Sequence, residues 1–287
     1  MKMLRMSVFL FVVIFATITI SFQAAHAQLP RNSHFKKVVY IIFENENYEP
    51  VVVQPDFARF AKLGALFTKM RAEVHPSQGN YIAMVAGSAY GITSDSNVDL
   101  PHRHIGDLLE NAGKDWRVYA EEYPGNCFTG KRSGKYVRKH NPFMSFTNVT
   151  SNPKRCAKIE SDARFFQDYA NGTLPEFSMY IPNMDNDGHD TTIDFAGKWL
   201  TTRFGSILSN PAALGDVLFI VTYDESDLSS AKNEIYTVAI GAQIAAGSQN
   251  SQTLNHPALL KMIEDEFKIG NLGKDDLSAP IISGIWK

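Results

Sequence analysis

The chain has 287 residues, 44% of them hydrophobic and 20% charged, which is enough apolar material for one large or two small folded domains. Its formal net charge is −2 and no block of like charge interrupts it, which argues against nucleic acid as the main partner.

The first 27 residues have the pattern of a secretory signal peptide. Lys2 and Arg5 give a positive start, residues 6–20 are almost wholly apolar, and residues 25–27 (Ala-His-Ala) offer a small-residue cleavage site. The apolar run is short for a membrane span, and no second run follows, so we expect no stable membrane insertion, and the cleavage site makes a retained signal anchor the weaker alternative. Cleavage would move the net charge from −2 to about −4. We expect a secreted protein (periplasmic in a bacterium) with residues 28–287 as a single domain.

Short runs rich in β-branched and aromatic residues recur along the chain and predict strands buried in a parallel sheet. The predicted strands are Lys37–Phe43, Trp116–Ala120, Phe177–Ile181, Val217–Tyr223 and Ile235–Ile240. Helices are predicted between them, at Asp56–Leu63, Tyr81–Ala86, Ile105–Ala112 and His256–Phe267. This alternation favours a doubly wound α/β fold.

Two of the predicted strands end in pairs of oxygen-bearing side chains. Glu44 and Asn45 follow the first strand, and Asp224 and Glu225 follow the fourth. Ligands of open α/β sheets collect at the carboxyl ends of the strands, so both pairs should arrive at one edge. Four converging oxygen ligands predict a bound cation.

Ser77 is a candidate nucleophile. It follows Pro76 at the predicted start of a helix, where it could simply be an N-cap. The N–H groups and the dipole at a helix start also favour a bound anion, and Asn80, one helical turn further on, could reach the same anion. A metal beside the hydroxyl would make it nucleophilic.

A third polar cluster follows the strand that ends at Ile181. It contains Asp185, Asp187, His189 and Asp190. These residue types also dominate solvated turns, and that alternative stays open. The spacing suits metal ligation, and it would equally place His189 beside a phosphoryl group.

Cys127 and Cys156 are most simply one disulfide in an exported protein. They lie in or next to a polar, basic stretch, 124–155, which we interpret as a long excursion over the sheet edge. Asn148 and Asn171 begin glycosylation sequons, which would be used only in a eukaryotic source.

Seven segments in one order carry a family resemblance. They are Glu44-Asn45-Glu46-Asn47-Tyr48; His75-Pro76-Ser77 with Asn80-Tyr81; Tyr119 to Gly125 with Cys127; Lys139-His140-Asn141-Pro142-Phe143; Pro182-Asn183 with Asn186 to Asp190; Tyr223-Asp224-Glu225; and Asn255-His256 with Leu259-Leu260 and Ile263 to Asp265. Together they resemble the phosphoesterase family of secreted acid phosphatases and bacterial phospholipases C, within the alkaline-phosphatase-like superfamily. The similarity runs from about Lys37 to Gly273. Gln78-Gly79 stands where the family often has Leu-Pro.

The resemblance implies a three-layer α/β/α sandwich with a mostly parallel central sheet. It also implies that Ser77 forms a phosphoserine intermediate. The metal that contacts Ser77 would be bound by Glu44, Asn45, Asp224 and Glu225. The residues expected to surround the phosphoryl group or to hold a second cation are Asn80, His140, Asp187, His189 and His256. A Glu at position 225 makes the ligand set hard, favouring Ca, Mg or Mn over Zn at that site.

The expected function is hydrolysis of phosphate monoesters by a secreted, metal-dependent, acid-phosphatase-like enzyme. In that mechanism Asn80 and His140 hold the phosphoryl oxygens, and His189 or His256 protonates the leaving group. The first alternative is a phospholipase C acting on phospholipid headgroups, with an aromatic rim from Phe128, Phe143 and Phe146. The others are a non-catalytic binding protein that keeps the fold and, ranked last, a Ser77-Asp224-His256 serine hydrolase, which lacks a G-x-S-x-G segment.

Overall fold

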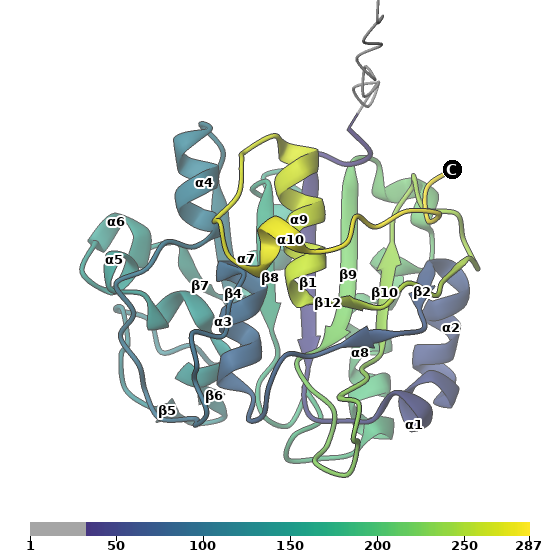
Figure 1. Cartoon of the computed structure of the whole chain (residues 1–287), viewed down its shortest axis with the longest axis horizontal. Helices are drawn as coiled ribbons and strands as arrows, with labels where there is room; N and C mark the ends of the chain where they lie inside the picture. Colours follow the sequence, from purple (N-terminus) through teal and green to yellow (C-terminus); the bar gives the residue numbers. More distant parts are fainter. Residues whose placement is uncertain (1–32) are drawn as a thin grey trace, which may run out of the picture. The chain divides into compact units, whose positions relative to one another are not determined.

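An eight-stranded sheet lies at the centre of the computed structural model, which describes residues 33–287 (Figure 1). The predicted signal peptide, residues 1–27, lies outside the described residues. The strand order is β11-β2-β10-β9-β1-β8-β4-β7. The bounds are β1 Lys37–Phe43, β2 Ala65–Phe67, β4 Trp116–Ala120, β7 Ile159–Ser161, β8 Phe177–Ile181, β9 Val217–Tyr223, β10 Thr237–Ile240 and β11 Gln249–Asn250.

The sheet is mostly parallel, as the sequence predicts. Strand β1 pairs in parallel with β8 on one side and β9 on the other, and β4 continues the parallel array between β8 and β7. Strand β10 pairs antiparallel with both β9 and β2, and it begins two residues after the predicted Ile235. The carboxyl ends of β1, β8 and β9 therefore meet at one edge.

Helices cover both faces of the sheet, which makes the fold a three-layer α/β/α sandwich. Helices α3 (Gln78–Ala86) and α9 (His256–Phe267) pack together on one face, in front of the sheet in Figure 1. Helices α2 (Pro55–Leu63) and α8 (Ile193–Leu208) pack together on the other. The remaining helices are α1 Tyr48–Val53, α4 Ile105–Asn111, α5 Thr147–Thr150, α6 Pro153–Cys156, α7 Asp162–Ala170 and α10 Asp275–Ser278.

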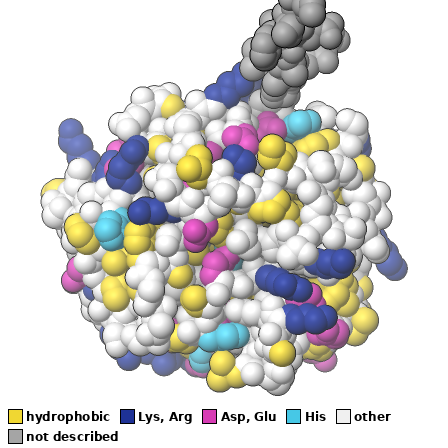
Figure 2. All heavy atoms as spheres, viewed as in Figure 1, with side chains coloured by type: hydrophobic (Ala, Val, Ile, Leu, Met, Phe, Trp, Pro, Cys, Tyr) yellow, Lys and Arg dark blue, Asp and Glu magenta, His cyan; other side chains and the backbone are white. Residues whose placement is uncertain are grey.

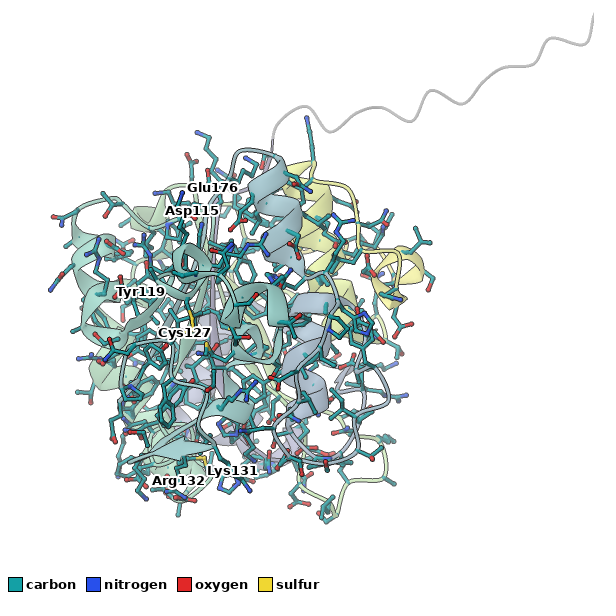
Figure 3. The ribbon with its side chains drawn as sticks, turned by 90° about the vertical axis from the view of Figure 1, so that its left-hand side faces the viewer. Asp115, Tyr119, Cys127, Lys131, Arg132 and Glu176 are labelled. Carbon is teal, nitrogen blue, oxygen red and sulfur yellow. A yellow bond between two sulfur atoms is a disulfide. The ribbon has the colours of Figure 1, made fainter. Side chains whose placement is uncertain are left out.

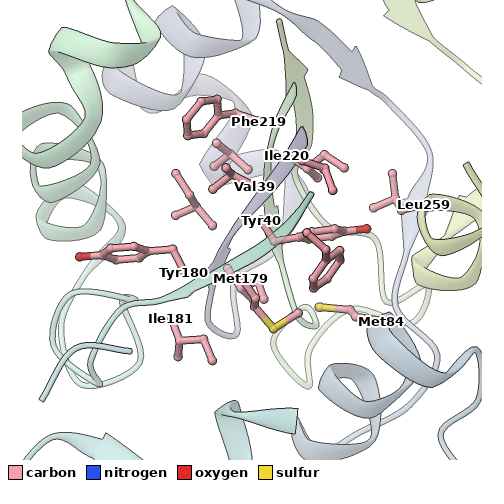
Figure 4. Close-up of a cluster of buried hydrophobic side chains, with 14 of the residues drawn as sticks. Val39, Tyr40, Met84, Met179, Tyr180, Ile181, Phe219, Ile220 and Leu259 are labelled. Carbon is pink, nitrogen blue, oxygen red and sulfur yellow. The ribbon is translucent and has the colours of Figure 1, made fainter. Parts of the chain in front are cut away.

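Alternate side chains of the central strands fill the two halves of the core. Tyr40 of β1 points to the face of α3 and α9, where Met84 and Leu259 approach it (Figure 4). Its neighbour Val39 points to the opposite face. There the ring of Tyr180 lies 4.9 Å, centroid to centroid, from that of Phe204 of α8. Burial on both faces explains the continuous apolar runs in the sequence.

The segment predicted to be an excursion folds against the β4–β7 side of the sheet. Figure 3 views this side and labels Cys127, Lys131 and Arg132 within the segment. It contains a small hairpin, β5 (Arg132–Ser133) with β6 (Tyr136–Val137), and two 3₁₀ turns, Arg138–His140 and Pro142–Ser145. The small sheet β3 (Met70–Arg71) with β12 (Leu254–Asn255) lies elsewhere, next to α9.

The predicted disulfide joins Cys127 to Cys156, with the two Cα atoms 5.4 Å apart. The two cysteines are 29 positions apart in the sequence, and the loop that they close carries Lys139 and His140. Replacing both cysteines by alanine is expected to lower the free energy of unfolding by about 3 kcal/mol, because the unfolded chain regains loop entropy. The melting temperature should then fall by roughly 6–12 °C. Calorimetry of the double variant against the oxidised parent measures this, and equal melting temperatures would contradict it.

The two sequons differ in their surroundings. Asn171 is exposed at the end of α7. The half-buried Asn148 amide donates to both carboxylate oxygens of Asp107 at 3.1 Å, contacts that a glycan would disturb. Glycosylation at either position stays a prediction.

The face that carries α3 and α9 has basic and acidic side chains interspersed over it (Figure 2). Among the described residues, no helix is both long enough and apolar enough to cross a bilayer.

Candidate active site

The two acidic pairs lie together at the carboxyl edge of the sheet. The Asp224 N–H donates to the Phe43 carbonyl at 3.0 Å, which continues the β1–β9 pairing past the strands. In return, the Asn45 N–H donates to Asp224 Oδ1 at 3.3 Å. Asn45 itself has a φ of 40°, a left-handed conformation that turns the chain sharply after Glu44.

Ser77 directs its hydroxyl into this cluster rather than capping its helix. It immediately precedes α3, and its side chain makes no hydrogen bond to the helix N–H groups. Instead, Ser77 Oγ lies 3.0 Å from Glu44 Oε2 and 3.1 Å from Glu225 Oε1. A single hydroxyl proton thus faces acceptors from the segments that follow β1 and β9, and the residue is fully buried.

His140 and Asp187 complete the cluster on the other side of Glu44. His140 Nε2 lies 3.0 Å from Glu44 Oε1, and His140 Nδ1 lies 3.4 Å from Asp187 Oδ2. The imidazole is stacked on Tyr81 of α3 at 4.9 Å between ring centroids. One ligand atom from each of Glu44, His140 and Asp187 lies within 4.8 Å of the others, so this buried group could hold a metal ion.

The charges of this cluster are costly without a cation. Burial raises the pKa of Glu44 to about 7 and that of Glu225 to about 7. Burial and the Glu44 charge raise the pKa of Asp187 and of Asp224 well above their usual range. Burial and the Lys139 charge lower the pKa of His140, which favours its neutral, metal-binding form. Either protons or a positive ion must therefore accompany these carboxyl groups.

The donor set fits a divalent cation. Each of the four acidic residues has one buried carboxylate oxygen that makes no hydrogen bond, although an imidazole nitrogen lies near the first three: Glu44 Oε1, Asp187 Oδ2, Glu225 Oε2 and Asp224 Oδ2. The Asn45 amide oxygen likewise faces only acceptors, although rotating the amide would let its nitrogen donate to Glu44 and Asp224. Buried oxygens that face one another are typical of a site for a hard cation such as Ca, Mg or Mn.

Asn80 has a different neighbourhood from the one expected. Its Oδ1 accepts from the N–H groups of Glu73 and Val74 at 2.9 and 3.0 Å, and its Nδ2 donates to the Val74 carbonyl at 2.8 Å. These bonds fasten the segment that leads to Ser77. A direct contact between Asn80 and a phosphoryl group stays a prediction that these bonds do not favour.

The two histidines predicted to protonate the leaving group are in contrasting positions. His256, fully buried at the start of α9, places Nε2 2.8 Å from the Asp224 carbonyl, and burial lowers its pKa to about 4. His189 has a side chain 31% exposed, and its ring centroid lies 6.3 Å from that of His140. Only His189 of the two reaches solvent.

Three titratable residues at the site had no role in the sequence prediction. His75 Nδ1 lies close to Glu225 Oε2. Because His75 is only two residues before Ser77, the sequence could have predicted that it lies at the site. The Lys139 ammonium donates to Asp95 Oδ2 at 2.8 Å. Burial opposes the charge of Lys139, but the carboxylates of Glu44 and Asp95 outweigh it and raise its pKa. Asp95 lies in a loop without a recognisable pattern, so the sequence held no signal for it.

The fold and the site define an α/β protein with a buried, carboxylate-rich centre and a serine at the edge of its sheet. The chain belongs to the phosphoesterase family, because the model of that family matches residues 45–270.

Its relatives include a probable acid phosphatase of Kluyveromyces lactis, 33% identical over 260 residues. That alignment covers 86% of this chain and 62% of the relative, so the chain spans less than two thirds of that protein. A phosphatidylinositol-3-phosphatase of Mycobacterium tuberculosis is 34% identical over 269 residues, covering 91% of this chain and 85% of the relative.

The fold is that of the alkaline phosphatase superfamily. A solved structure of a superfamily protein from Vibrio parahaemolyticus superposes with a TM-score of 0.54 at 15% identity, covering 88% of this chain and 71% of that one. The predicted fold class and family are thereby confirmed.

Proposed function

We propose that this chain is a metal-dependent phosphomonoesterase that works through a phosphoserine at Ser77. The observation that carries the proposal is the buried Ser77 hydroxyl, held between Glu44 Oε2 and Glu225 Oε1 at 3.0 and 3.1 Å. The family and the names of its relatives support a phosphoric ester as substrate.

Glu44, His140 and Asp187 would hold a cation on one side of the serine. Asn45, Asp224 and Glu225 would contribute oxygen ligands for a cation on the other side of Ser77. A divalent ion there supplies positive charge that favours the serine alkoxide and offsets the charge of the phosphoryl group.

The first half of the reaction transfers the phosphoryl group to the protein. Ser77 Oγ passes its one proton to Glu44 or Glu225, both of which lie within hydrogen-bond distance, and attacks phosphorus in line. The bond from phosphorus to the ester oxygen breaks, and the alcohol leaves. His189 is the better candidate to protonate that oxygen, because it is partly exposed whereas His256 is fully buried.

The second half restores the serine. Water attacks the phosphoserine on the side from which the alcohol left, and His189, now neutral, accepts a proton from that water. The bond between phosphorus and Ser77 Oγ breaks, the serine oxygen takes back the proton held by Glu44 or Glu225, and inorganic phosphate is released.

The packing of the aromatic residues favours a monoesterase over a phospholipase C. Phe143 and Phe146 are fully buried, and Phe143 stacks on Trp116 at 4.3 Å between ring centroids. The Phe128 ring lies 6.3 Å from that of the buried Tyr136. Two of the three expected rim residues are therefore core residues, which leaves little apolar surface from them to contact lipid.

The contacts of His256 also disfavour a serine hydrolase of the Ser-His-Asp type. His256 Nε2 bonds to the Asp224 main-chain carbonyl, and Ser77 Oγ contacts carboxylates rather than an imidazole. Export of the protein is supported by the composition of residues 1–27 and by the Cys127–Cys156 disulfide.

A substrate panel tests the proposed function. We expect p-nitrophenyl phosphate to be hydrolysed at least about 100-fold faster than p-nitrophenylphosphorylcholine, because the site binds a terminal phosphoryl group with two negative charges. Release of p-nitrophenol by metal-loaded protein measures both. Preference for the diester would favour the phospholipase C alternative, and no turnover of either would leave a binding protein. Phosphatidylinositol 3-phosphate is a third substrate to compare.

A further inference from the structure

Asp95 places a carboxylate at the N-terminus of the helix that follows Ser77. The Gln78 N–H, the first of α3, donates to Asp95 Oδ1 at 3.2 Å. The Lys139 ammonium donates to the other oxygen, Oδ2, at 2.8 Å. Asp95 thus occupies two positively polarised donors, one of them on the residue next to Ser77.

One buried side chain holds the Asp95 loop in this position. Gln78 Nε2 donates to the carbonyls of Ser94 and Ser96, at 3.1 and 2.7 Å, on either side of Asp95. Gln78 is buried, whereas Ser94 and Ser96 are exposed. The loop is therefore attached to the helix mainly on its inner side, through the Gln78 side chain.

Lys139 belongs to the charge system of the site. It adjoins His140, its side chain is only 14% exposed, and its charge acts on the carboxylates of Glu44 and Glu225. Asp95 acts on Glu225 as well, in the opposite sense. Asp95 is bonded to the N–H of the residue that follows Ser77, and Lys139 is bonded to Asp95, so both partners of this ion pair lie beside the helix start that carries Ser77.

We propose that the Lys139 ammonium and the Gln78 N–H bind oxygens of the phosphoryl group, and that Asp95 occupies both donors in the ligand-free protein and is displaced by phosphate. A helix N–H and an ammonium bind carboxylate and phosphoryl oxygens by the same hydrogen bonds. The Gln78 N–H has a single proton and cannot donate fully to both Asp95 and a phosphoryl oxygen, so Asp95 competes with substrate and product for that donor and for the charge of Lys139. This inference rests on the proposed function, since it concerns the same site.

Binding of inorganic phosphate to metal-loaded protein tests the inference without turnover. Asp95→Asn keeps the size of the side chain and removes its charge, so the phosphate dissociation constant should fall roughly 5-fold. Lys139→Gln removes a charged donor, so the constant should rise roughly 10-fold. Titration calorimetry gives both values, and the inhibition constant of phosphate in the ester assay should follow them.

Two further variants separate competition from a structural role. Gln78→Leu releases the Asp95 loop and should tighten phosphate binding as Asp95→Asn does. Asp99→Asn is the matched control, because Asp99 lies four residues further on and pairs with Arg138 instead. It should leave the constant unchanged. If Asp95 only capped the helix and did not compete with phosphate, Asp95→Asn would have a lower melting temperature but an unchanged dissociation constant for phosphate.

The outcomes distinguish this inference from the proposed function. If the parent protein hydrolyses monoesters but Asp95→Asn binds phosphate no more tightly, or Lys139→Gln no more weakly, the inference alone is wrong. If the parent protein neither binds phosphate nor hydrolyses esters, both are wrong. Tighter binding in Asp95→Asn and Gln78→Leu, with weaker binding in Lys139→Gln, supports it.

Discussion

Replacing Ser77 by alanine is expected to lower kcat/KM for a phosphate monoester by about 1,000-fold or more. The reason is that the nucleophilic oxygen is lost while the surrounding carboxylates stay in place. Glu44 and Glu225 are positioned by the ends of β1 and β9, not by the serine. Metal binding should therefore survive, and hydrolysis should not. Stopped-time assays with p-nitrophenyl phosphate measure the loss, and elemental analysis measures the retained ion.

Ser178→Ala is the control for this substitution. Ser178 is also a fully buried serine, in β8, and its hydroxyl has no hydrogen-bond partner. Its removal should leave turnover unchanged within about twofold, because no bond is lost and the site is untouched. Full turnover in Ser77→Ala would refute the nucleophile assignment. An equal loss in both variants would point to damage of the fold instead.

The central strands could be predicted from the sequence because their physical cause is local. Burial on both faces demands an unbroken apolar run, and β1, β4, β8 and β9 match the predicted strands residue for residue. The direction of β10 could not be predicted in this way, since an apolar run looks the same in either direction.

Helix α8 was not predicted, although it is the longest helix among the described residues. Gly197 and Gly205 and two threonines in its middle weaken the helical pattern. The glycine at position 197 has a tertiary cause: a Cβ there would lie 2.6 Å from Gln54 Oε1, the side chain that caps α2. Close packing of two helices decided this residue, and no local pattern reveals such packing.

The same division between local and tertiary causes applies to the site. The proximity of Glu44 and Asp224 could be predicted from the sequence, because the carboxyl ends of parallel strands meet at one edge of the sheet. His140 could not, because its place beside Glu44 depends on the fold of the segment between the cysteines. The contact between Asp95 and Lys139 is even harder to predict from the sequence, since the two residues come from two different irregular segments.

If the proposed divalent ion is bound, its removal is expected to abolish hydrolysis and to reverse the pH dependence of stability. In chelated protein, the pKa values of Glu44 and Glu225 are raised to about 7. Between about pH 4.5 and 7 the folded chain then binds more protons than the unfolded chain, whose glutamates have ordinary pKa values. Stability of the chelated protein must therefore fall as the pH rises through this window.

The metal-loaded protein should behave in the opposite way, because the ion replaces the protons and binds more tightly as the carboxyl groups ionise. The gap in melting temperature between loaded and chelated protein should widen by on the order of 5–10 °C from pH 5 to pH 7.5. Scanning calorimetry at both pH values, with re-addition of Ca, Mg, Mn or Zn, measures the gap and identifies the ion that restores turnover.

Two aspartates in one loop provide the matched comparison. Asp187→Asn should weaken retention of the ion and lower turnover by roughly 100-fold, because it removes a charge from the cluster with Glu44 and His140. Asp185→Asn should change neither, since Asp185 pairs with Lys135 at a half-exposed position. Full activity in the presence of excess chelator, or a gap in melting temperature that does not change with pH, would show that the buried carboxylates are balanced by protons alone.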